Sequence, residues 1–315
     1  MDGVLIIDKP AGMTSHDVVA RVRKTTGHRR VGHTGTLDPF ATGVLVVLVG
    51  RATRLAQFLS GAEKEYEAVI RLGYATDTGD ITGVRIEPES HARTQGKPGF
   101  REEEIESAMA SLRGEVEQTP PMYSAKKVGG KKLYELARRG EEIERQPVCV
   151  NISEFTAIAN DGHLLTDNAD AVKDLKVRVA CSAGTYIRTL AEDLGKQLGV
   201  GAHVAELRRT RAGQFKIADA ITLDQLREEA QAGSLAQILR SPDAALSFLP
   251  AMQLSEDDVR RVGQGIDLQV EETVASLWTD GQAVRMRVID GQLIAVGTYD
   301  EERKTVHPKV VIAIA

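Results

Sequence analysis

Cysteine is scarce in this sequence of 315 residues, and histidine does not gather around it. The two cysteines, Cys149 and Cys181, allow at most one disulfide, and the seven scattered histidines form no cluster with metal-ligand spacing. These absences argue against a disulfide-stapled secreted domain and against a structural or catalytic metal. We expect both thiols to be free, because a reducing compartment normally keeps them so.

Long apolar runs are missing as well. No stretch approaches the roughly 20 apolar residues that span a bilayer. The N-terminal sequence MDGVLIIDKP lacks the basic region and long apolar stretch of a signal peptide. The sequence therefore predicts a cytoplasmic protein without a membrane segment. Its length favours two domains, and its hydrophobic content of 42% predicts an ordinary buried core.

An overall positive charge is also lacking. The formal net charge is −5, which argues against a general nucleic-acid coat protein. One segment departs from this balance: SAKKVGGKKLYELARRG, residues 124–140, carries six basic residues and one acidic residue. Such a run is about as often a solvated helix face as a phosphate-binding surface, so both interpretations stay open at this point.

Hydrophobic periodicity predicts a mixture of helices and strands. The expected strands are 4–7, 44–49, 66–72, 177–181 and 284–288, and the expected helices are 16–25, 101–113 and 187–198. Thr14 and Asp17 have the spacing of a capping box in front of the first helix. Near the C-terminus, Asp290-Gly291 between two alternating runs predicts a β-hairpin. The fold class is therefore α+β, with domains expected at 1–245 and 251–315.

Asp38 lies in GHRRVGHTGTLDPFATG, a loop rich in glycine and threonine that precedes the buried strand 44–49. Such a loop can place a carboxylate at the end of a sheet, facing a cleft. Taken alone, Leu37-Asp38-Pro39 is more often an ordinary turn, because Asp and Pro both favour turns. A lone aspartate is therefore weak support for catalysis, and the interpretation depends on the sequence around it.

That surrounding sequence closely resembles the TruB family of pseudouridine synthases over residues 3–223. The blocks that carry the resemblance are GVLIIDKPAGMTSHDVV, RRVGHTGTLDPFATGVLVVLVGRATRL, KEYEAVIRLG with DTGD, QTPPMYSAKKVGGKKLYELARRG, CSAGTYIRTLAEDLG and GAHVAELRRTRAGQF. The tail 251–315 resembles the PUA domain that usually follows. The resemblance implies a pseudouridine synthase fold, with a mixed, largely antiparallel sheet flanked by helices, and a small β-barrel-like PUA domain.

The resemblance also implies the reaction. The N1–C1′ bond of a uridine breaks, the uracil turns, and it rejoins the ribose through C5. No redox change occurs, so no cofactor is expected. By resemblance Asp38 is the catalytic carboxylate, Arg188 pairs with it and favours its charged form, and Tyr66 stacks on the uracil and helps to move the proton at C5. Attack on C1′, addition to the base and removal of the 2′ proton remain open as routes.

Further residues are expected around the target nucleotide. By resemblance Leu207 contacts the base, His33 fills the space that the flipped base vacates, and Asp80 is a polar partner within the site. Tyr186 is expected at the start of a helix, over a sheet edge. The insertion at about 118–147 is expected to clamp the T arm of tRNA through phosphate contacts. The basic residues assigned to that RNA-binding surface are Lys126, Lys131, Lys132, Arg208, Arg209 and Arg211.

The implied substrate is the uridine at position 55 in the T loop of tRNA, which must leave its stack to be reached. We expect a monomer that acts on tRNA without a guide RNA. The guide-RNA-dependent synthases of archaea and eukaryotes are the nearest alternative, but by resemblance they lack the basic insertion. A non-catalytic RNA-binding protein or tRNA-folding chaperone is a second alternative, and it would not need Asp38, Tyr66 and Arg188 together. Ala183 stands where many relatives have lysine, so one basic contact is expected to be absent.

Overall fold

The structure is a computed structural model of the chain. It describes residues 1–86, 100–124, 126–137, 139–141, 143–159, 161–167 and 172–313, without the side chains of residues 127, 128, 131, 132 and 134. Within these residues, no helix is both long and apolar enough to cross a membrane.

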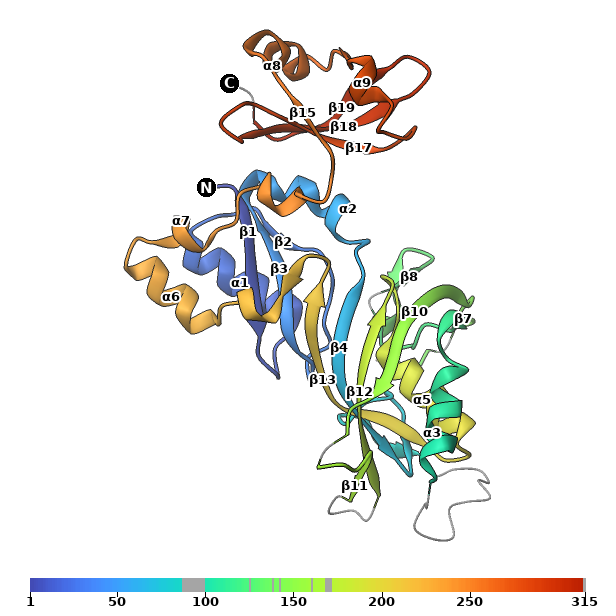
Figure 1. Cartoon of the computed structure of the whole chain (residues 1–315). Coiled ribbons are helices and arrows are strands. Elements are labelled where there is room, and N and C mark those ends of the chain that lie inside the picture. The colour runs from blue at the N-terminus through green and yellow to red at the C-terminus, as the bar shows by residue number, and fades with distance from the viewer. Residues whose placement is uncertain are drawn as a thin grey trace.

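A large twisted sheet forms the body of the molecule (Figure 1). Its main strand order is β1-β3-β13-β4-β12-β10-β7, and β2, β11 and β14 pair at its margins. Every neighbouring pair is antiparallel except β3 and β13, so the expected mixed, largely antiparallel sheet is confirmed. The strands are β1 (Gly3–Lys9), β2 (Val31–His33), β3 (Thr42–Val49), β4 (Lys64–Leu72), β7 (Gly114–Gln118), β10 (Val148–Ala157), β11 (Leu165–Asp167), β12 (Lys173–Cys181), β13 (Ala202–Ala212) and β14 (Phe215–Lys216).

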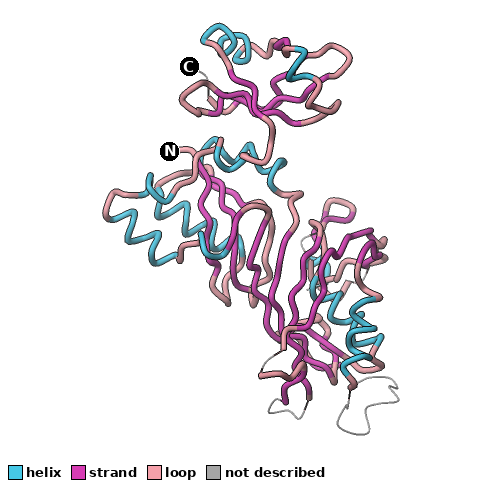
Figure 2. The backbone as a smooth tube through the Cα atoms, viewed as in Figure 1, coloured by secondary structure: helices cyan, strands magenta, loops and turns pink. Residues whose placement is uncertain are grey.

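Helices and short strand pairs surround this sheet (Figure 2). The helices of this part are α1 (Ser15–Thr26), α2 (Ala56–Leu59), α3 (Glu102–Ala110), α4 (Leu133–Ala137), α5 (Ile187–Gln197), α6 (Leu223–Gln231) and α7 (Leu235–Ile238), with 3-10 turns η1 (Gly50–Leu55), η2 (Ile217–Asp219) and η3 (Ala244–Leu246). Two short pairs, β5 (Ala75–Thr76) with β6 (Arg85–Ile86) and β8 (Lys127–Val128) with β9 (Lys131–Lys132), lie apart from the main sheet.

The predicted start of the first helix is confirmed. Thr14 Oγ1 accepts the N–H of Asp17 at 3.1 Å, and the Asp17 carboxylate accepts the N–H of Thr14 at 2.9 Å. This reciprocal capping box satisfies two of the backbone donors that a helix N-terminus leaves free. As a result α1 begins at Ser15, close to the residue that the spacing predicts.

Strands β1 and β3, which pair next to the Asp38 loop, are buried on both faces, as the apolar run 44–49 predicts for β3. On one face of β1, Leu5 and Ile7 pack with Val18 and Val22 of α1. On the other face, Val4 and Ile6 pack with η1 and with part of the C-terminal sheet. Burial on both faces makes this edge of the sheet a rigid support for the loop between β2 and β3.

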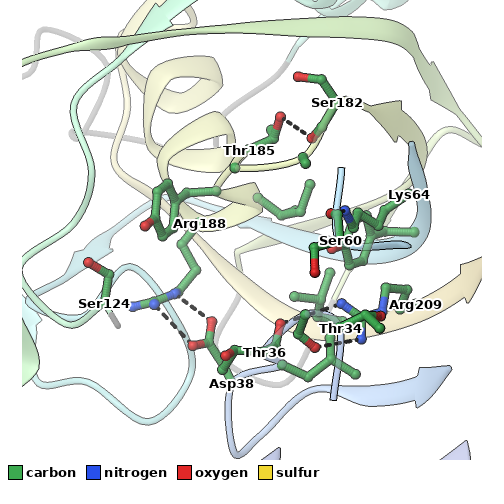
Figure 3. A pocket seen from close by; sticks show the side chains of 18 residues that line it. Thr34, Thr36, Asp38, Ser60, Lys64, Ser124, Ser182, Thr185, Arg188 and Arg209 are labelled. Atoms are coloured by element: carbon green, nitrogen blue, oxygen red, sulfur yellow. Dashed lines mark hydrogen bonds and ion pairs between the residues drawn. The ribbon is translucent and has the colours of Figure 1, made fainter. Parts of the chain in front are cut away.

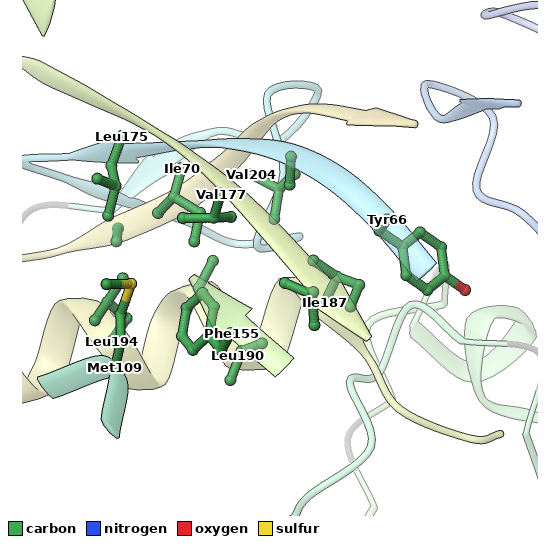
Figure 4. Close-up of a cluster of buried hydrophobic side chains, with 14 of the residues drawn as sticks. Tyr66, Ile70, Met109, Phe155, Leu175, Val177, Ile187, Leu190, Leu194 and Val204 are labelled. Atoms are coloured by element: carbon green, nitrogen blue, oxygen red, sulfur yellow. The ribbon is translucent and has the colours of Figure 1, made fainter. Parts of the chain in front are cut away.

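A second apolar cluster lies between the middle of the sheet and helices α3 and α5 (Figure 4). Ile70, Val177 and Val204 of the sheet face Leu190 and Leu194 of α5. Tyr66 lies at one end of this cluster, where the packed core stops. The helix therefore has a fixed position over the sheet, and its first turn reaches the end of the core where Tyr66 lies.

A smaller five-stranded sheet contains the C-terminal residues (Figure 1). Its order is β15-β17-β18-β19-β16, and the predicted hairpin is confirmed, since β17 and β18 pair antiparallel around the Asp290-Gly291 turn. Leu293, Val296 and Ile312 share an apolar cluster with the first strands of the large sheet. The elements are β15 (Ala251–Gln253), α8 (Glu256–Gly263), β16 (Leu268–Gln269), α9 (Glu272–Ala275), β17 (Ala283–Arg287), β18 (Leu293–Asp300) and β19 (Thr305–Val311).

Candidate active site

Asp38 lies in the loop that joins β2 to β3, and buried groups fix this loop. Ser15 Oγ accepts the N–H of Leu37 at 2.9 Å and lies 3.2 Å from the Leu37 carbonyl oxygen, to which its hydroxyl donates. The N–H of Ala41 donates to the carbonyl oxygen of Asp38 at 3.1 Å, which closes a turn over Pro39. A loop held at both ends in this way keeps its carboxylate in one place.

Lys9, the last residue of β1, is fully buried and holds the same loop. Its ammonium donates to the carbonyl oxygens of Ala41 at 2.6 Å, Pro10 at 2.9 Å and Pro39 at 3.2 Å. All three donors of the ammonium therefore have an acceptor. Burial lowers the pKa of Lys9 to about 8, and the negative charge of Asp38 opposes that shift.

Arg188, in the first turn of α5, grips the Asp38 carboxylate with two nitrogens. Arg188 Nε lies 2.9 Å from Asp38 Oδ2, and Arg188 Nη2 donates to Asp38 Oδ1 at 3.2 Å. The guanidinium also donates to the carbonyl oxygens of Thr78 and Tyr123, each at 2.8 Å. The Arg188 side chain is only 4% exposed, so the cationic side of this two-pronged ion pair is buried.

Asp80 completes the charge network from the other side of the guanidinium. Its Oδ2 lies 3.6 Å from Arg188 Nη1, and its Oδ1 accepts hydrogen bonds from Thr78 Oγ1 at 2.9 Å and from the N–H of Thr82 at 3.0 Å. Backbone bonds between Val204 and the residues on either side of Asp80 fix this turn against β13. One buried cation therefore lies between two carboxylates.

A cavity of about 280 Å³ opens beside Asp38 and Arg188 (Figure 3). Tyr66 and Leu207 form its apolar wall, and Tyr186 lines it at the start of α5. The remaining lining residues come mainly from two loops, Thr34–Leu37 and Ser182–Thr185. Asp38, Arg188, Tyr66, Leu207 and Tyr186, which the sequence assigns to one site, therefore do lie around one cavity.

The surroundings of Asp38 pull its pKa in two directions. Burial raises the pKa of the carboxyl, and the negative charge of Asp80 acts in the same direction. Arg188 and Lys9 lower it, but the net shift is upward from the ordinary value. Arg188 thus opposes a protonation that burial favours. The sequence expectation named Asp80 only as a polar partner within the site and did not include the effect of its charge on the pKa of Asp38.

Two further buried cations line the cavity, and one of them, Lys64, was not singled out by the sequence. Lys64 begins β4 and Arg209 lies on β13, and they are 8% and 2% exposed. Arg209 was expected on an exposed basic RNA-binding surface, but its side chain is buried. Its guanidinium donates to the carbonyl oxygens of Val44, Gly35 and Thr36, so it anchors the start of the Asp38 loop.

Other predicted residues lie outside this cavity. Arg208 lies beside Arg209 but lines a different hollow. Arg208 pairs with Asp8 at 2.7 Å, and Arg211 pairs with Glu63 at 2.6 Å. Arg208 was assigned to the basic RNA-binding surface, and it lies on the face of β13 opposite Arg209, because successive residues of a strand point to opposite faces.

His33 and Lys126 are also not among the residues that line the cavity. His33 precedes the lining residue Thr34, and burial lowers its pKa. Lys126 is half-buried, and its carbonyl oxygen accepts the N–H of Leu133. The side chains of Lys131 and Lys132 lie outside the described residues.

Comparison with known proteins gives this arrangement a family. A model described as TruB family pseudouridylate synthase, N-terminal domain, matches residues 23–187, and one described as tRNA pseudouridylate synthase B, C-terminal domain, matches residues 188–247. The chain belongs to the TruB family. It is therefore a pseudouridine synthase, which is an isomerase.

The relatives support the same family membership. A protein of Geobacillus thermodenitrificans (strain NG80-2) named tRNA pseudouridine synthase B is 44% identical over 270 residues, which is 86% of this chain and 86% of that protein. One of the same name from Bacillus cytotoxicus is 42% identical over 275 residues, covering 86% of this chain and 85% of that protein.

Solved structures share the fold. A chain from an H/ACA RNP bound to a substrate RNA containing 2′-deoxyuridine is 26% identical, with a TM-score of 0.71 and coverage of 99% of this chain and 85% of that one. A chain of an archaeal box H/ACA sRNP Nop10-Cbf5 complex gives a TM-score of 0.69 at 26% identity and covers 99% of this chain and 86% of that one. The pseudouridine synthase fold is thereby confirmed.

Proposed function

We propose that this TruB family member converts the uridine at position 55 in the T loop of tRNA to pseudouridine, acting as a monomer without a guide RNA. The observation that carries the proposal is the Asp38–Arg188 pair, which lies at the edge of a cavity walled by Tyr66 and Leu207. The names of the relatives, tRNA pseudouridine synthase B, support tRNA as the substrate class.

The geometry supports a base that has left its stack. The Asp38 side chain is 32% exposed and faces a cavity, so a nucleotide must enter the enzyme to meet it. Extrusion from an RNA loop costs a few kcal/mol. Stacking on Tyr66, worth about 1–3 kcal/mol for a base on an aromatic ring, and contact with Leu207 offset that cost.

The proposed chemistry needs an ionised carboxylate and conserves every atom. The N1–C1′ bond breaks, C5 bonds to C1′, the proton on C5 is lost and N1 gains one. Attack of Asp38 on C1′ and removal of the 2′ proton by Asp38 both start from the charged carboxylate. Arg188 favours that form, and Tyr66, buried beside Arg209, is the proposed participant in proton movement at C5.

The remaining assignments from sequence stand as proposals about RNA recognition. His33 is proposed to occupy the space left by the flipped base, and Lys126, Lys131 and Lys132 are proposed to contact phosphates of the T arm. Residues 1–245 are the proposed catalytic domain. Residues 251–315 are the proposed PUA domain, supported by the five-stranded C-terminal sheet. The proposed place of action is the cytoplasm.

A guide-RNA-dependent activity is the second candidate, favoured by the TM-score of 0.71 to a chain from an H/ACA RNP. The two candidates separate in one assay. The purified chain is incubated with an unmodified tRNA transcript and no other RNA, protein, cofactor or metal, and pseudouridine is mapped along the product. We expect pseudouridine at position 55 and none in a transcript with cytidine there. Absence of product, with the tRNA still bound, would contradict the proposal and favour a guide-dependent enzyme or a chaperone.

A further inference from the structure

The cavity beside Asp38 has a second end with a different charge. Figure 3 shows Lys64 and Ser60 across the cavity from Asp38 and Arg188, with Arg209 next to Lys64. Gly35 locates the two cations relative to each other. A Cβ atom placed on Gly35 would lie 3.7 Å from Arg209 Nη1 and 3.9 Å from Lys64 Cε. Two positive side chains therefore meet at one wall of the cavity.

Neither cation has a carboxylate partner among the residues that the structure describes. Lys64 Nζ donates to the carbonyl oxygens of Ala62 at 2.6 Å and Ser60 at 2.7 Å, and its third donor has no acceptor in the described part of the chain. Arg209 likewise donates to carbonyl oxygens, those of Val44, Gly35 and Thr36. At the other end of the cavity, by contrast, Arg188 is shared by two carboxylates.

Buried charges are normally paired, because an unpaired charge loses its hydration without compensation. Burial and the charge of Arg209 together lower the pKa of Lys64 to about 8. Lys64 is still mostly charged at neutral pH, so the site keeps an excess of positive charge. An anion that entered the cavity would relieve both the repulsion and the desolvation.

The wall around these cations suits an anion that brings its own oxygen atoms. Thr34, Ser60, Ser182 and Thr185 contribute hydroxyl groups to the lining, and Gly35 contributes no side chain. Hydroxyl groups and ammonium donors are common ligands of phosphate oxygens. Asp38 and Arg188 occupy the other end of the cavity. When the base of a nucleotide lies near Tyr66, the anions that the nucleotide can offer to Lys64 and Arg209 are its phosphate groups.

We propose that Lys64 and Arg209 form a phosphate subsite, which binds one of the two phosphodiester groups that flank the target uridine. The inference rests on the proposed function, since it takes an RNA substrate as given. Lys64 supplies a point charge with a free donor, and Arg209 supplies fixed positive charge while it holds the Asp38 loop. Substrate binding would thereby tie the position of the RNA backbone to the loop that carries the catalytic carboxylate.

The first test changes the RNA and leaves the enzyme intact. T-arm stem-loop RNAs carry a neutral methylphosphonate in place of the phosphodiester on the 5′ side or on the 3′ side of the target uridine. Binding to the wild-type chain is measured against the unmodified RNA. We expect one of the two to bind about 10- to 100-fold more weakly, the usual worth of a hydrogen bond to a charged group. If the chain binds both modified RNAs with the same affinity as the unmodified RNA, the proposal is overturned.

The second test couples the RNA change to the protein change. Lys64→Met removes the charge and keeps the length of the side chain, Lys64→Arg keeps the charge, and Lys216→Met at an exposed position is the matched control. If Lys64 contacts the sensitive phosphate, Lys64→Met weakens binding to the normal RNA and is nearly silent with the methylphosphonate RNA. Lys64→Arg restores part of the affinity. If the losses of affinity caused by Lys64→Met and by the methylphosphonate simply add in a folded chain, Lys64 does not contact the sensitive phosphate.

Free phosphate is the other source of the same chemistry, and a third arm separates it. Inorganic phosphate is titrated against RNA binding at constant ionic strength. Competition that disappears in Lys64→Met, together with a methylphosphonate effect, supports a phosphodiester subsite. Competition without any methylphosphonate effect assigns the site to free phosphate and overturns the RNA assignment. The proposed function is judged separately by product formation, which survives if only the subsite is wrong.

Discussion

The chain has two hollows on opposite faces of the same strands, and they differ in what they bury. Tyr66 and Arg209 are cross-strand partners that line the cavity of about 280 Å³, whereas the adjacent partners Glu67 and Arg208 line the other hollow, of about 370 Å³. The second hollow is lined by Phe40, Glu67, Glu206 and Arg208, but Tyr66, Asp38 and Arg188 are not among its lining residues. Size alone therefore does not identify the site.

At each hollow one lining arginine forms an ion pair with an aspartate, and the two pairs have similar lengths. Arg188 and Asp38 approach to 2.9 Å, and Arg208 and Asp8 to 2.7 Å. The Arg188 side chain is 4% exposed, whereas that of Arg208 is 40% exposed. When Arg208 is removed, water can solvate the carboxylate of its partner, but water has less access to the partners of the buried Arg188. We therefore expect the two pairs to respond differently to mutation.

The largest expected effect comes from Arg188→Met. The change leaves Asp38 and Asp80 without their shared cation, which favours protonation of one of them. We expect single-turnover pseudouridine formation to fall by about 10²–10³-fold and the free energy of unfolding by about 3–5 kcal/mol. Arg188→Lys, which keeps the charge but not the two-pronged contact, is expected to recover only part of the rate. A rate within tenfold of wild type in a folded Arg188→Met chain would contradict the proposed role.

Asp80→Asn tests the second carboxylate through pH. Burial and the negative charge of Asp80 raise the pKa of Asp38. As the pH falls, Asp38 therefore loses its active, ionised form at a higher pH than an ordinary aspartate does. Removing the charge of Asp80 lowers the pKa of Asp38, because it removes a like charge and leaves Arg188 to Asp38 alone. The acidic limb of the kcat/KM profile should move to lower pH, while the rate near neutrality falls by about tenfold through the loss of loop order. An acidic limb that stays in place or moves upward would rule out this coupling.

Ser15→Ala tests the support of the Asp38 loop and is expected to have a moderate effect. It removes both hydrogen bonds to Leu37 and leaves a buried backbone donor unsatisfied. The free energy of unfolding should fall by about 1–3 kcal/mol. Turnover should fall more than RNA affinity, because the loop positions a reacting group. Denaturant unfolding and a comparison of kcat with Kd check both parts, and Ser107→Ala on α3 is a control away from the cavity.

The smallest effect is expected from Arg208→Met. Its ion pair with Asp8 is half-exposed, so its loss should change stability by less than about 1 kcal/mol. Because Arg208 faces away from Asp38, turnover should remain within about twofold of wild type. A large loss of activity or RNA affinity would give the second hollow a role in substrate binding and would break the comparison between the two faces.

Local patterns in the sequence predicted the elements well but not the faces on which they place side chains. The capping box at Thr14 and Asp17 and the alternation of β4 depend on neighbouring residues, and both are confirmed. The faces of Arg208 and Arg209 could not be predicted, because register shifts between Val204 and Glu206 and between Arg209 and Arg211 interrupt the alternation of β13.

The site itself depended on long-range contacts. Arg188 and Asp38 lie 150 residues apart, and only the family resemblance indicated that they pair. Lys9 shows why residue type alone can mislead. A lysine at the end of a strand is expected to be exposed to solvent, but the carbonyl oxygens that accept its hydrogen bonds come partly from a loop 30 residues further along the chain. A buried cation held by carbonyl groups leaves no local signal in the sequence.

The central claim is that Asp38 performs the reaction, and Asp38→Asn tests it most directly. Affinity for unmodified tRNA and single-turnover pseudouridine formation are measured on the same preparation. The account predicts affinity within about threefold of wild type, since one neutral substitution in the cavity leaves the phosphate contacts in place, and no detectable product. Product at a rate near that of wild type would contradict the assignment of Asp38 as the catalytic carboxylate.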